Sequence, residues 1–140
     1  MKQGNLVGDF QVPPHPKGIS IDGRMVTLKP LIASQFAEEL FLSNSIDKDV
    51  TNWAYLPYGP FEILETYSQW IKSFEGKEDP VFFAIISKKL KKAIGIASYL
   101  RINPKDGSIE VGHINYSPLL QRTTEATEAM FLMMKWVFDN

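Results

Sequence analysis

Hydrogen-bond donors gather between residues 119 and 130, where the sequence reads LLQRTTEATEAM. Arg122 carries a guanidinium that can hold a phosphate through two parallel hydrogen bonds, and Thr123 and Thr124 add hydroxyl groups. A dense apolar run follows, so a helix should begin here, with backbone N–H groups that lack partners inside the helix. Such a helix start favours an anion. The alternative is that Thr123 or Thr124 caps the helix while Gln121 and Arg122 face water.

Two side chains upstream could move a proton. Glu110 lies beside Gly112 in a predicted strand and could act as a general base towards an ammonium substrate, directly or through water; the alternative is an exposed strand carboxylate. Because side chains alternate along a strand, His113 should lie on the face opposite Glu110. His113 could also be a base, although a hydrogen-bonded core histidine is the favoured interpretation. Gly112 could mark a β-bulge beside the site or serve only packing.

The composition excludes several other kinds of chemistry. The chain has no cysteine, which rules out disulfides and thiolate catalysis, and its 2 histidines, His15 and His113, lie far apart in sequence. No metal-ligand spacing is present, so we expect no metal. The formal net charge of -1 gives no broad basic surface for nucleic acid. No apolar stretch is long enough to span a membrane, and no signal-peptide pattern is present. We therefore expect a cytoplasmic protein without nucleic-acid or membrane partners.

The elements that must position these residues follow from the spacing of apolar and turn residues. Short loops between the later strands predict an antiparallel meander. Ser34 is the expected N-cap of the first helix, and Pro60 is expected in the first turn of the second. The predicted order is a strand over 25–31, helices over 34–43 and 59–76, strands over 81–87, 93–102 and 108–116, and a helix over 123–140.

This order predicts an α+β domain with helices packed on a mostly antiparallel sheet. Residues 1–24 are rich in proline and glycine, so we interpret them as an irregular N-terminal arm, with the domain over 25–140. The last helix is apolar nearly all round, which is typical of a helix buried on most sides. Because the predicted elements offer little to cover its far side, we expect another surface to do so.

Several segments resemble the GNAT superfamily of N-acetyltransferases, and in particular its ribosomal-protein (RimJ/RimL-like) branch. The superfamily signature is Q/R-x-x-G-x-G/A at the start of the helix after the fourth strand, often continued as A-T-E-A. Residues 121–129, QRTTEATEA, are similar to it, and residues 23–31, 53–61 and 109–113 resemble further family segments in the same order. Thr124 is a departure, because it stands where the superfamily has a glycine that lets backbone approach a pyrophosphate closely.

The resemblance implies an acetyl-CoA-dependent N-acetyltransferase that acts on a primary amine, on a protein N-terminus or a small molecule. The pyrophosphate would lie on the helix start, and the pantetheine arm would pair with the fourth strand like an added strand. The implied cofactor-binding residues are Ile114, Tyr116, Gln121, Arg122, Thr123, Thr124, Ala126 and Thr127. The loop with Trp53 and Tyr58 would contact the acceptor, although Trp53 could instead be an aromatic plug over the sheet.

The resemblance also predicts that this chain is incomplete. In the superfamily a fifth strand, a fourth helix and a final hairpin follow, and the cofactor lies where the fourth and fifth strands part. We therefore expect a GNAT-like domain truncated after its third helix. Its apolar last helix and open fourth strand should form a homo-oligomer or a domain-swapped dimer. The alternative function is a non-catalytic CoA-binding or interaction module on a degenerate GNAT scaffold, which Thr124 and the missing part favour.

Overall fold

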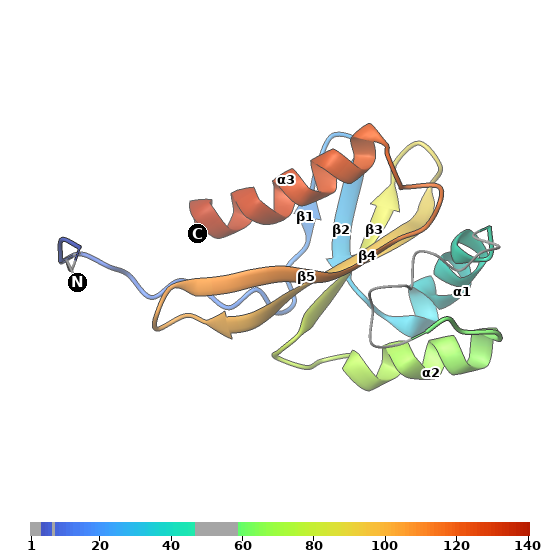
Figure 1. The fold of residues 1–140 in the computed structure, drawn as a ribbon, viewed down its shortest axis with the longest axis horizontal. Helices are drawn as coiled ribbons and strands as arrows, with labels where there is room; N and C mark the ends of the chain where they lie inside the picture. Colours follow the sequence, from blue (N-terminus) through green and yellow to red (C-terminus); the bar gives the residue numbers. More distant parts are fainter. Residues whose placement is uncertain (1–3, 7, 47–58) are drawn as a thin grey trace.

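The computed structural model describes residues 4–6, 8–46 and 59–140, which form a single antiparallel sheet and three helices (Figure 1). The 5-stranded sheet has the order β1-β2-β3-β4-β5, so each strand pairs with its neighbours in sequence. This confirms the predicted α+β class. The elements are β1 (Ile21–Asp22), β2 (Val26–Pro30), α1 (Ala33–Asn44), α2 (Leu64–Phe74), β3 (Val81–Ser87), β4 (Lys92–Asn103), β5 (Ser108–Tyr116) and α3 (Thr124–Asp139).

The sheet separates two apolar cores (Figure 1). Helix α3 packs on one face, where Ala129, Leu132 and Met133 are buried against strand residues such as Phe83 and Tyr99. Helices α1 and α2 cover part of the other face and enclose a second set of buried residues. Strands β3 and β4 have helices on both sides, which explains their continuous apolar sequences.

The chain before β2 is less irregular than predicted. Ile21 and Asp22 form β1, which pairs with β2 through Ile21↔Leu28 and Asp22↔Thr27. The turn between the two strands closes with a hydrogen bond from the Gly23 N–H to the Val26 carbonyl, at 2.9 Å. A strand of two residues has no alternation to detect, and its neighbouring glycines and prolines gave only turn signals.

The predicted cap of α1 and the predicted start of α2 are wrong, although α1 itself begins within one residue of its prediction. Ser34 does not cap α1, whose N-cap Ile32 makes no side-chain capping bond. The N–H of Ala33 instead donates to Glu75 Oε1 at 2.6 Å, from the end of α2. Helix α2 begins at Leu64 rather than near Pro60. Residues 60–63 precede the helix, and the Phe61 ring lies 5.3 Å from the ring of Tyr67. Long-range contacts therefore decide both starts.

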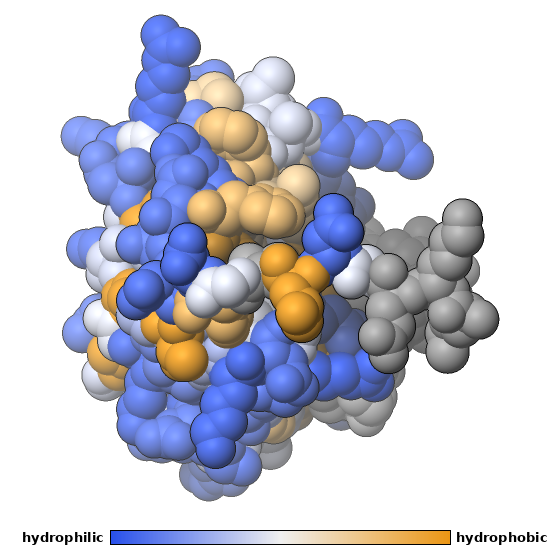
Figure 2. Space-filling view, turned by 90° about the vertical axis from the view of Figure 1, so that its left-hand side faces the viewer, coloured by the Kyte–Doolittle hydropathy of each residue, from blue (hydrophilic) through white to orange (hydrophobic). Residues whose placement is uncertain are grey.

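The last helix matches its prediction to within one residue at each end. Its outer side is not covered by the described residues, because the side chains of Phe131, Met134 and Phe138 are 57%, 49% and 85% exposed. Apolar surface is visible in Figure 2, which looks at the side of the molecule where α3 ends and the N-terminal segment lies. None of the described helices has the length and apolar character needed to cross a membrane.

Candidate active site

Strand β5 forms one edge of the sheet and carries a bulge in its middle. No strand pairs with its outer edge among the described residues. Its register with β4 runs from Ser98↔Gly112 to Ile96↔Asn115, so two residues of β5, His113 and Ile114, stand opposite one residue of β4. His113 has a φ of 47°, in the left-handed region that non-glycine residues seldom adopt. The bulge expected beside Gly112 is thus confirmed.

The bulge overturns the prediction that His113 lies on the face opposite Glu110. Phe82, Ser98 and Gly112 are register partners across three strands, and Phe82 belongs to the core under α1 and α2. The His113 ring lies 5.6 Å from the Phe82 ring, on this same side of the sheet. Glu110 is there as well, since a Cβ on Gly112 would lie 3.8 Å from Glu110 Oε1. One extra residue reverses the alternation of side chains, and both candidates for proton transfer share a face.

An arginine held by a second bulge accompanies Glu110. Arg101 Nη1 lies 3.4 Å from Glu110 Oε2, and the two side chains are 82% and 47% exposed. Arg101 has a φ of 49°, where the register of β4 and β5 shifts again. The carboxylate of Asp79 accepts hydrogen bonds from the N–H groups of Arg101 and Ile102, at 3.1 and 2.9 Å. Asp79 therefore supports the backbone turn that brings Arg101 to Glu110.

The start of α3 combines a cap with a set of unused donors. Thr123 Oγ1 accepts a hydrogen bond from the Ala126 N–H at 3.2 Å, so Thr123 is the N-cap, as the simpler interpretation predicted. The cap uses one N–H. Among the described residues, no hydrogen bond is donated by the backbone N–H groups of residues 122–125. The two interpretations are therefore compatible, because a capped helix still presents free donors to an anion.

The side chains around this start divide into free and engaged groups. Arg122 is exposed, has a φ of 58° and makes no ion pair with any described residue. Gln121 is engaged, since its Nε2 donates to the Tyr116 carbonyl at 2.8 Å and ties the end of β5 to the following loop. Thr124 is exposed, and its Oγ1 lies 3.5 Å from Met25 Sδ. Burial raises the pKa of the Tyr116 phenol above its ordinary value.

Glu128 is a site residue that was not predicted from the sequence, although it lies in the A-T-E-A part of the signature. Its Oε1 accepts hydrogen bonds from the N–H groups of Met25 and Val26, at 2.8 and 3.1 Å. Gly23 is the second missed residue, because a Cβ there would lie 2.2 Å from Glu128 Oε1. The sequence spacing could not reveal this contact between α3 and the β1–β2 turn, which joins residues more than a hundred positions apart.

Most predicted site residues lie in one continuous strip, formed by β5 and the start of α3, and two lie outside the described residues. Glu110, His113, Ile114 and Tyr116 lie on β5, and the residues from Gln121 to Thr127 follow in the loop and first turn of α3. Within this strip Ile114 and Thr127 are exposed and Ala126 is half-buried. Trp53 and Tyr58, expected to contact the acceptor, lie outside the described residues. No group of three or more described His, Asp or Glu side chains could hold a metal ion.

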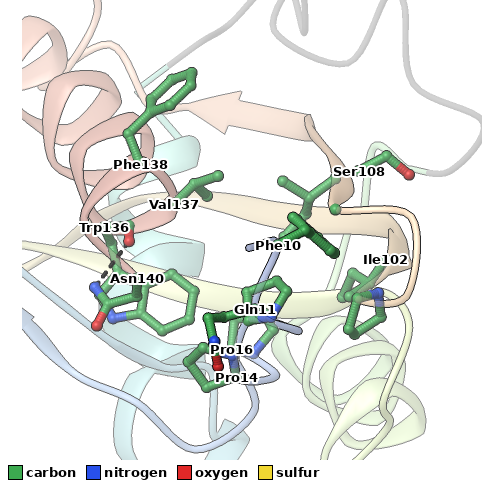
Figure 3. Close-up of a pocket in the computed structure, with 14 residues that line it drawn as sticks. Phe10, Gln11, Pro14, Pro16, Ile102, Ser108, Trp136, Val137, Phe138 and Asn140 are labelled. Carbon is green, nitrogen blue, oxygen red and sulfur yellow. Dashed lines mark hydrogen bonds between the residues drawn. The ribbon is translucent and has the colours of Figure 1, made fainter. Parts of the chain in front are cut away.

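A separate cavity of about 240 Å³ lies away from this strip, between the N-terminal segment, the β4–β5 hairpin and the end of α3 (Figure 3). Pro14, Trp136 and Phe138 are among the residues that line it, and none of its lining residues carries an ionisable side chain. The cavity therefore offers no group for acid–base chemistry, and the strip on β5 and α3 remains the candidate site.

Comparisons with known proteins identify similar structures. A scan of protein-family models gave no match, and neither did a search of curated proteins. Among solved structures, the chain is similar to a GCN5-related N-acetyltransferase from Brucella melitensis, with a TM-score of 0.90 and 34% identity over 95% of this chain and 60% of that one. It is also similar to a probable acetyltransferase of the GNAT family from Chromobacterium violaceum, with a TM-score of 0.87 and 32% identity over 99% of this chain and 69% of the other.

A more distant likeness concerns the fold alone. The ribosomal-protein-S5-alanine acetyltransferase from Vibrio fischeri matches with a TM-score of 0.57 and 17% identity, over 86% of this chain and 68% of that chain. In all three cases the present chain spans only 60% to 69% of the length of the solved chain.

Proposed function

Because this chain belongs to the GNAT family of acetyltransferases, we propose that it binds acetyl-CoA and transfers the acetyl group to a primary amine. The acceptor amine is on a protein N-terminus, as in the ribosomal-protein branch that the motifs resemble, or on a small molecule. The observation that carries this proposal is the row of backbone N–H groups at residues 122–125, which find no acceptor among the described residues. The row follows a short loop after β5, whose outer edge pairs with no described strand.

The donor set of this helix start fits the diphosphate of CoA. Backbone N–H groups at a helix start bind phosphate oxygens, and the exposed guanidinium of Arg122 can add two charge-assisted hydrogen bonds. The Thr124 side chain narrows the approach but brings its own hydroxyl donor. The open edge of β5 offers backbone groups to the amides of the pantetheine arm, as when a peptide adds to a sheet. Ile114 and Tyr116 would contribute there, and Ala126 and Thr127 would border the phosphates.

Acetyl-CoA supplies the acetyl group as a thioester, and the residues of this chain prepare the amine that receives it. Glu110 would take a proton from the acceptor ammonium, which makes the amine nucleophilic. Arg101 orients the Glu110 carboxylate, and His113 lies on the same face of the sheet as a second candidate base. Backbone N–H groups near the bulge can stabilise the negative charge that develops on the carbonyl oxygen.

A second candidate function is CoA binding without turnover. It is favoured by the environment of Thr124, whose Oγ1 lies 3.5 Å from Met25 Sδ and 3.4 Å from the carboxylate of Glu125. A side chain and a nearby negative charge, where the superfamily has glycine, would weaken the approach of a phosphate. Release of free CoA thiol in the presence of a polyamine or a short peptide with a free N-terminus would support the enzyme. Saturable acetyl-CoA binding without release of CoA thiol would support a binding module that has no acetyltransferase activity.

Calorimetric titration with acetyl-CoA tests the proposal directly. We expect saturable binding by the 140-residue chain, weakened about tenfold or more in the Arg122→Ala/Thr124→Ala variant, because a charge-assisted hydrogen bond contributes roughly 1.5–3 kcal/mol. The control is Lys105→Ala, which removes an exposed cation at the β4–β5 turn and should bind like wild type. Wild-type protein that shows no saturable binding would contradict the proposal. Equal weakening in the control would point to non-specific attraction instead.

We also propose that the chain self-associates through the uncovered side of α3 and the open edge of β5. Phe131 and Phe138 are 57% and 85% exposed on α3, and exposed apolar surface of this kind is typical of an interface. An unpaired strand edge offers backbone hydrogen bonds to a second chain. Their combination favours a homodimer, by docking or by exchange of elements.

A further inference from the structure

We propose that Glu128 is a positioning residue, which holds the phosphate-binding start of α3 at its working position against the β1–β2 turn. The inference rests on the proposed function, since it assigns a role in acetyl-CoA binding to a side chain that need not touch the cofactor. Glu128 lies in the second turn of α3, after the N-cap Thr123. Its carboxylate points to the β1–β2 turn, where it meets backbone rather than side chains.

One oxygen of Glu128 receives both hydrogen bonds. The N–H groups of Met25 and Val26 donate to Oε1 at 2.8 and 3.1 Å, in a part-buried environment. Bonds from N–H groups to an ionised carboxylate are stronger than bonds between neutral groups. The carboxylate therefore fixes the direction of α3 relative to the beginning of β2.

The β1–β2 turn can receive this carboxylate only because residue 23 is glycine. A Cβ at Gly23 would lie 2.2 Å from Glu128 Oε1 and 2.5 Å from Leu132 Cδ1, well inside van der Waals contact. The turn is held from its other side by Lys88, whose Nζ lies 3.0 Å from Asp22 Oδ1 and donates to the Gly23 carbonyl at 2.5 Å. Lys88 therefore anchors the turn to the sheet, and Glu128 anchors the helix to the turn.

The same contact reaches the proposed phosphate site. Met25, which donates to Glu128, also places its Sδ 3.5 Å from Thr124 Oγ1 in the first turn of α3. On the other side, Gln121 ties the preceding loop to the end of β5. The free N–H groups of residues 122–125 are therefore held between Gln121 and Glu128. A displacement of about 1 Å in a site that positions reacting groups can cost on the order of 10²-fold in reaction rate.

Three variants separate positioning from general stability. Glu128→Ala removes the acceptor, while Glu128→Gln keeps an amide oxygen for Met25 and Val26 but loses the charge. Glu39→Ala is the matched control, because Glu39 Oε2 also accepts a backbone N–H, from Ala93 at 2.7 Å. Glu39 lies on α1, against the opposite face of the sheet, so its loss should reduce stability without moving α3.

The experiment measures acetyl-CoA affinity by calorimetry and amide hydrogen exchange at Met25 and Val26 in each folded protein. We expect Glu128→Ala to weaken binding about tenfold and to speed exchange at both amides by a similar factor. Glu128→Gln should stay within about threefold of wild type in both measurements. Glu39→Ala should lower the unfolding midpoint but bind acetyl-CoA as wild type does. A loss of stability alone would produce no such difference between the two alanine variants.

The outcomes distinguish this inference from the proposed function. Wild-type binding that Glu128→Ala leaves unchanged would overturn the positioning role and leave the acetyltransferase proposal intact. Equal weakening in Glu128→Ala and Glu39→Ala would also overturn it, because the effect would then be general. A third outcome is that wild type binds no acetyl-CoA although the amides of Met25 and Val26 are protected from hydrogen exchange. The proposed function and the role of Glu128 in binding would then both be wrong, and only the hydrogen bonds to Glu128 would be supported.

A second pair of variants tests the contact between Glu128 and the β1–β2 turn by changing the turn. Gly23→Ala should weaken acetyl-CoA binding because the new methyl group displaces the Glu128 carboxylate, and it also meets Leu132 Cδ1 and the Val26 carbonyl oxygen, at 2.5 and 2.9 Å. In a Glu128→Ala background the same substitution should have a smaller effect, since the closest of these clashes is gone and coupled residues are non-additive. Full additivity of the two effects would show that Gly23 and Glu128 act separately, against the inference.

Discussion

Several described carboxylates accept hydrogen bonds from backbone N–H groups at irregular points of the fold. Glu39, Glu75, Asp79 and Glu128 each accept one or two such bonds, at a strand start, a helix start, a bulge and a turn. An N–H group left without an acceptor in a buried place costs roughly 1–3 kcal/mol. Glu110 is paired instead with the exposed side chain of Arg101, and no backbone N–H of a described residue donates to it. Because it also lies beside the bulge of β5, on the same face as His113, Glu110 is the carboxylate that we propose for proton transfer.

Replacing Glu110 by glutamine should separate catalysis from cofactor binding. Glu110→Gln keeps the size of the side chain but removes the base, so acetyl transfer to an amine should fall by roughly 10²-fold or more. The dissociation constant for acetyl-CoA should not change, because Glu110 acts on the acceptor. Release of CoA thiol at saturating acetyl-CoA measures the rate, and calorimetry measures the affinity.

Arg101→Ala provides the comparison for this substitution. The Arg101–Glu110 pair is largely exposed, and exposed pairs contribute about 0–1 kcal/mol, so this variant should lose less than about tenfold in rate. A Glu110→Gln protein with the wild-type rate would show that Glu110 is only a surface carboxylate of the strand, and would leave His113 as the remaining candidate base.

At the scale of elements, helix α1 shows how a distant residue can replace a local cap. Its first N–H groups find no acceptor in Ser34, the residue whose type and position predicted a cap. Glu75 supplies one instead, from just after α2, and accepts from the Ala33 N–H at 2.6 Å. The start of one helix is therefore fixed by the end of the next, which couples the two helices on this face of the sheet.

Paired substitutions test this coupling. Glu75→Ala should lower the free energy of unfolding by roughly 1–2 kcal/mol, the usual cost of removing a cap. Ser34→Ala should change it by less than about 0.5 kcal/mol, because Ser34 is exposed on the first turn and makes no capping bond. Urea denaturation followed by circular dichroism gives both values. If Ser34→Ala lowered the free energy of unfolding more than Glu75→Ala does, Ser34 would be the cap of α1 in solution.

The predictable elements are those with many apolar residues in a regular pattern. β3 and β5 have the predicted bounds, and α3 begins and ends within one residue of its prediction. Thr123 is one of the two threonines predicted as the cap of α3, and a cap of this kind is predictable because it depends on a neighbour three residues away. The cap of α1 and the start of α2 depend on contacts between distant residues, so the predictions for Ser34 and Pro60 were wrong. β1 was missed because a strand of two residues shows no alternation. The face of His113 was also wrong, because a bulge adds one residue and reverses a pattern of period two.

At the scale of the whole molecule, the elements that carry the proposed cofactor site leave surface uncovered. The outer edge of β5 has no partner strand among the described residues. Helix α3 presents one apolar side to the sheet and another, with Phe131, Met134 and Phe138, to solvent. The family members from Brucella melitensis and Chromobacterium violaceum are longer, since this chain spans 60% and 69% of them. We propose that a second copy of this 140-residue chain covers the exposed side of α3.

Substitution of the exposed phenylalanines tests self-association of the chain. Burying one phenylalanine side chain contributes roughly 1.5–3 kcal/mol, and a two-fold interface uses each side chain twice. Phe131→Ser/Phe138→Ser should therefore shift the protein towards monomer by several orders of magnitude in dissociation constant, as measured by sedimentation velocity over a range of concentrations. Leu42→Ser is the control, because Leu42 is 59% exposed on α1, against the other face of the sheet, and should leave the assembly unchanged. A wild-type protein that stays monomeric at high concentration would exclude the interface. A dimer that persists in the double variant would place the interface elsewhere. The outer edge of β5 would then be the next surface to test by substitution.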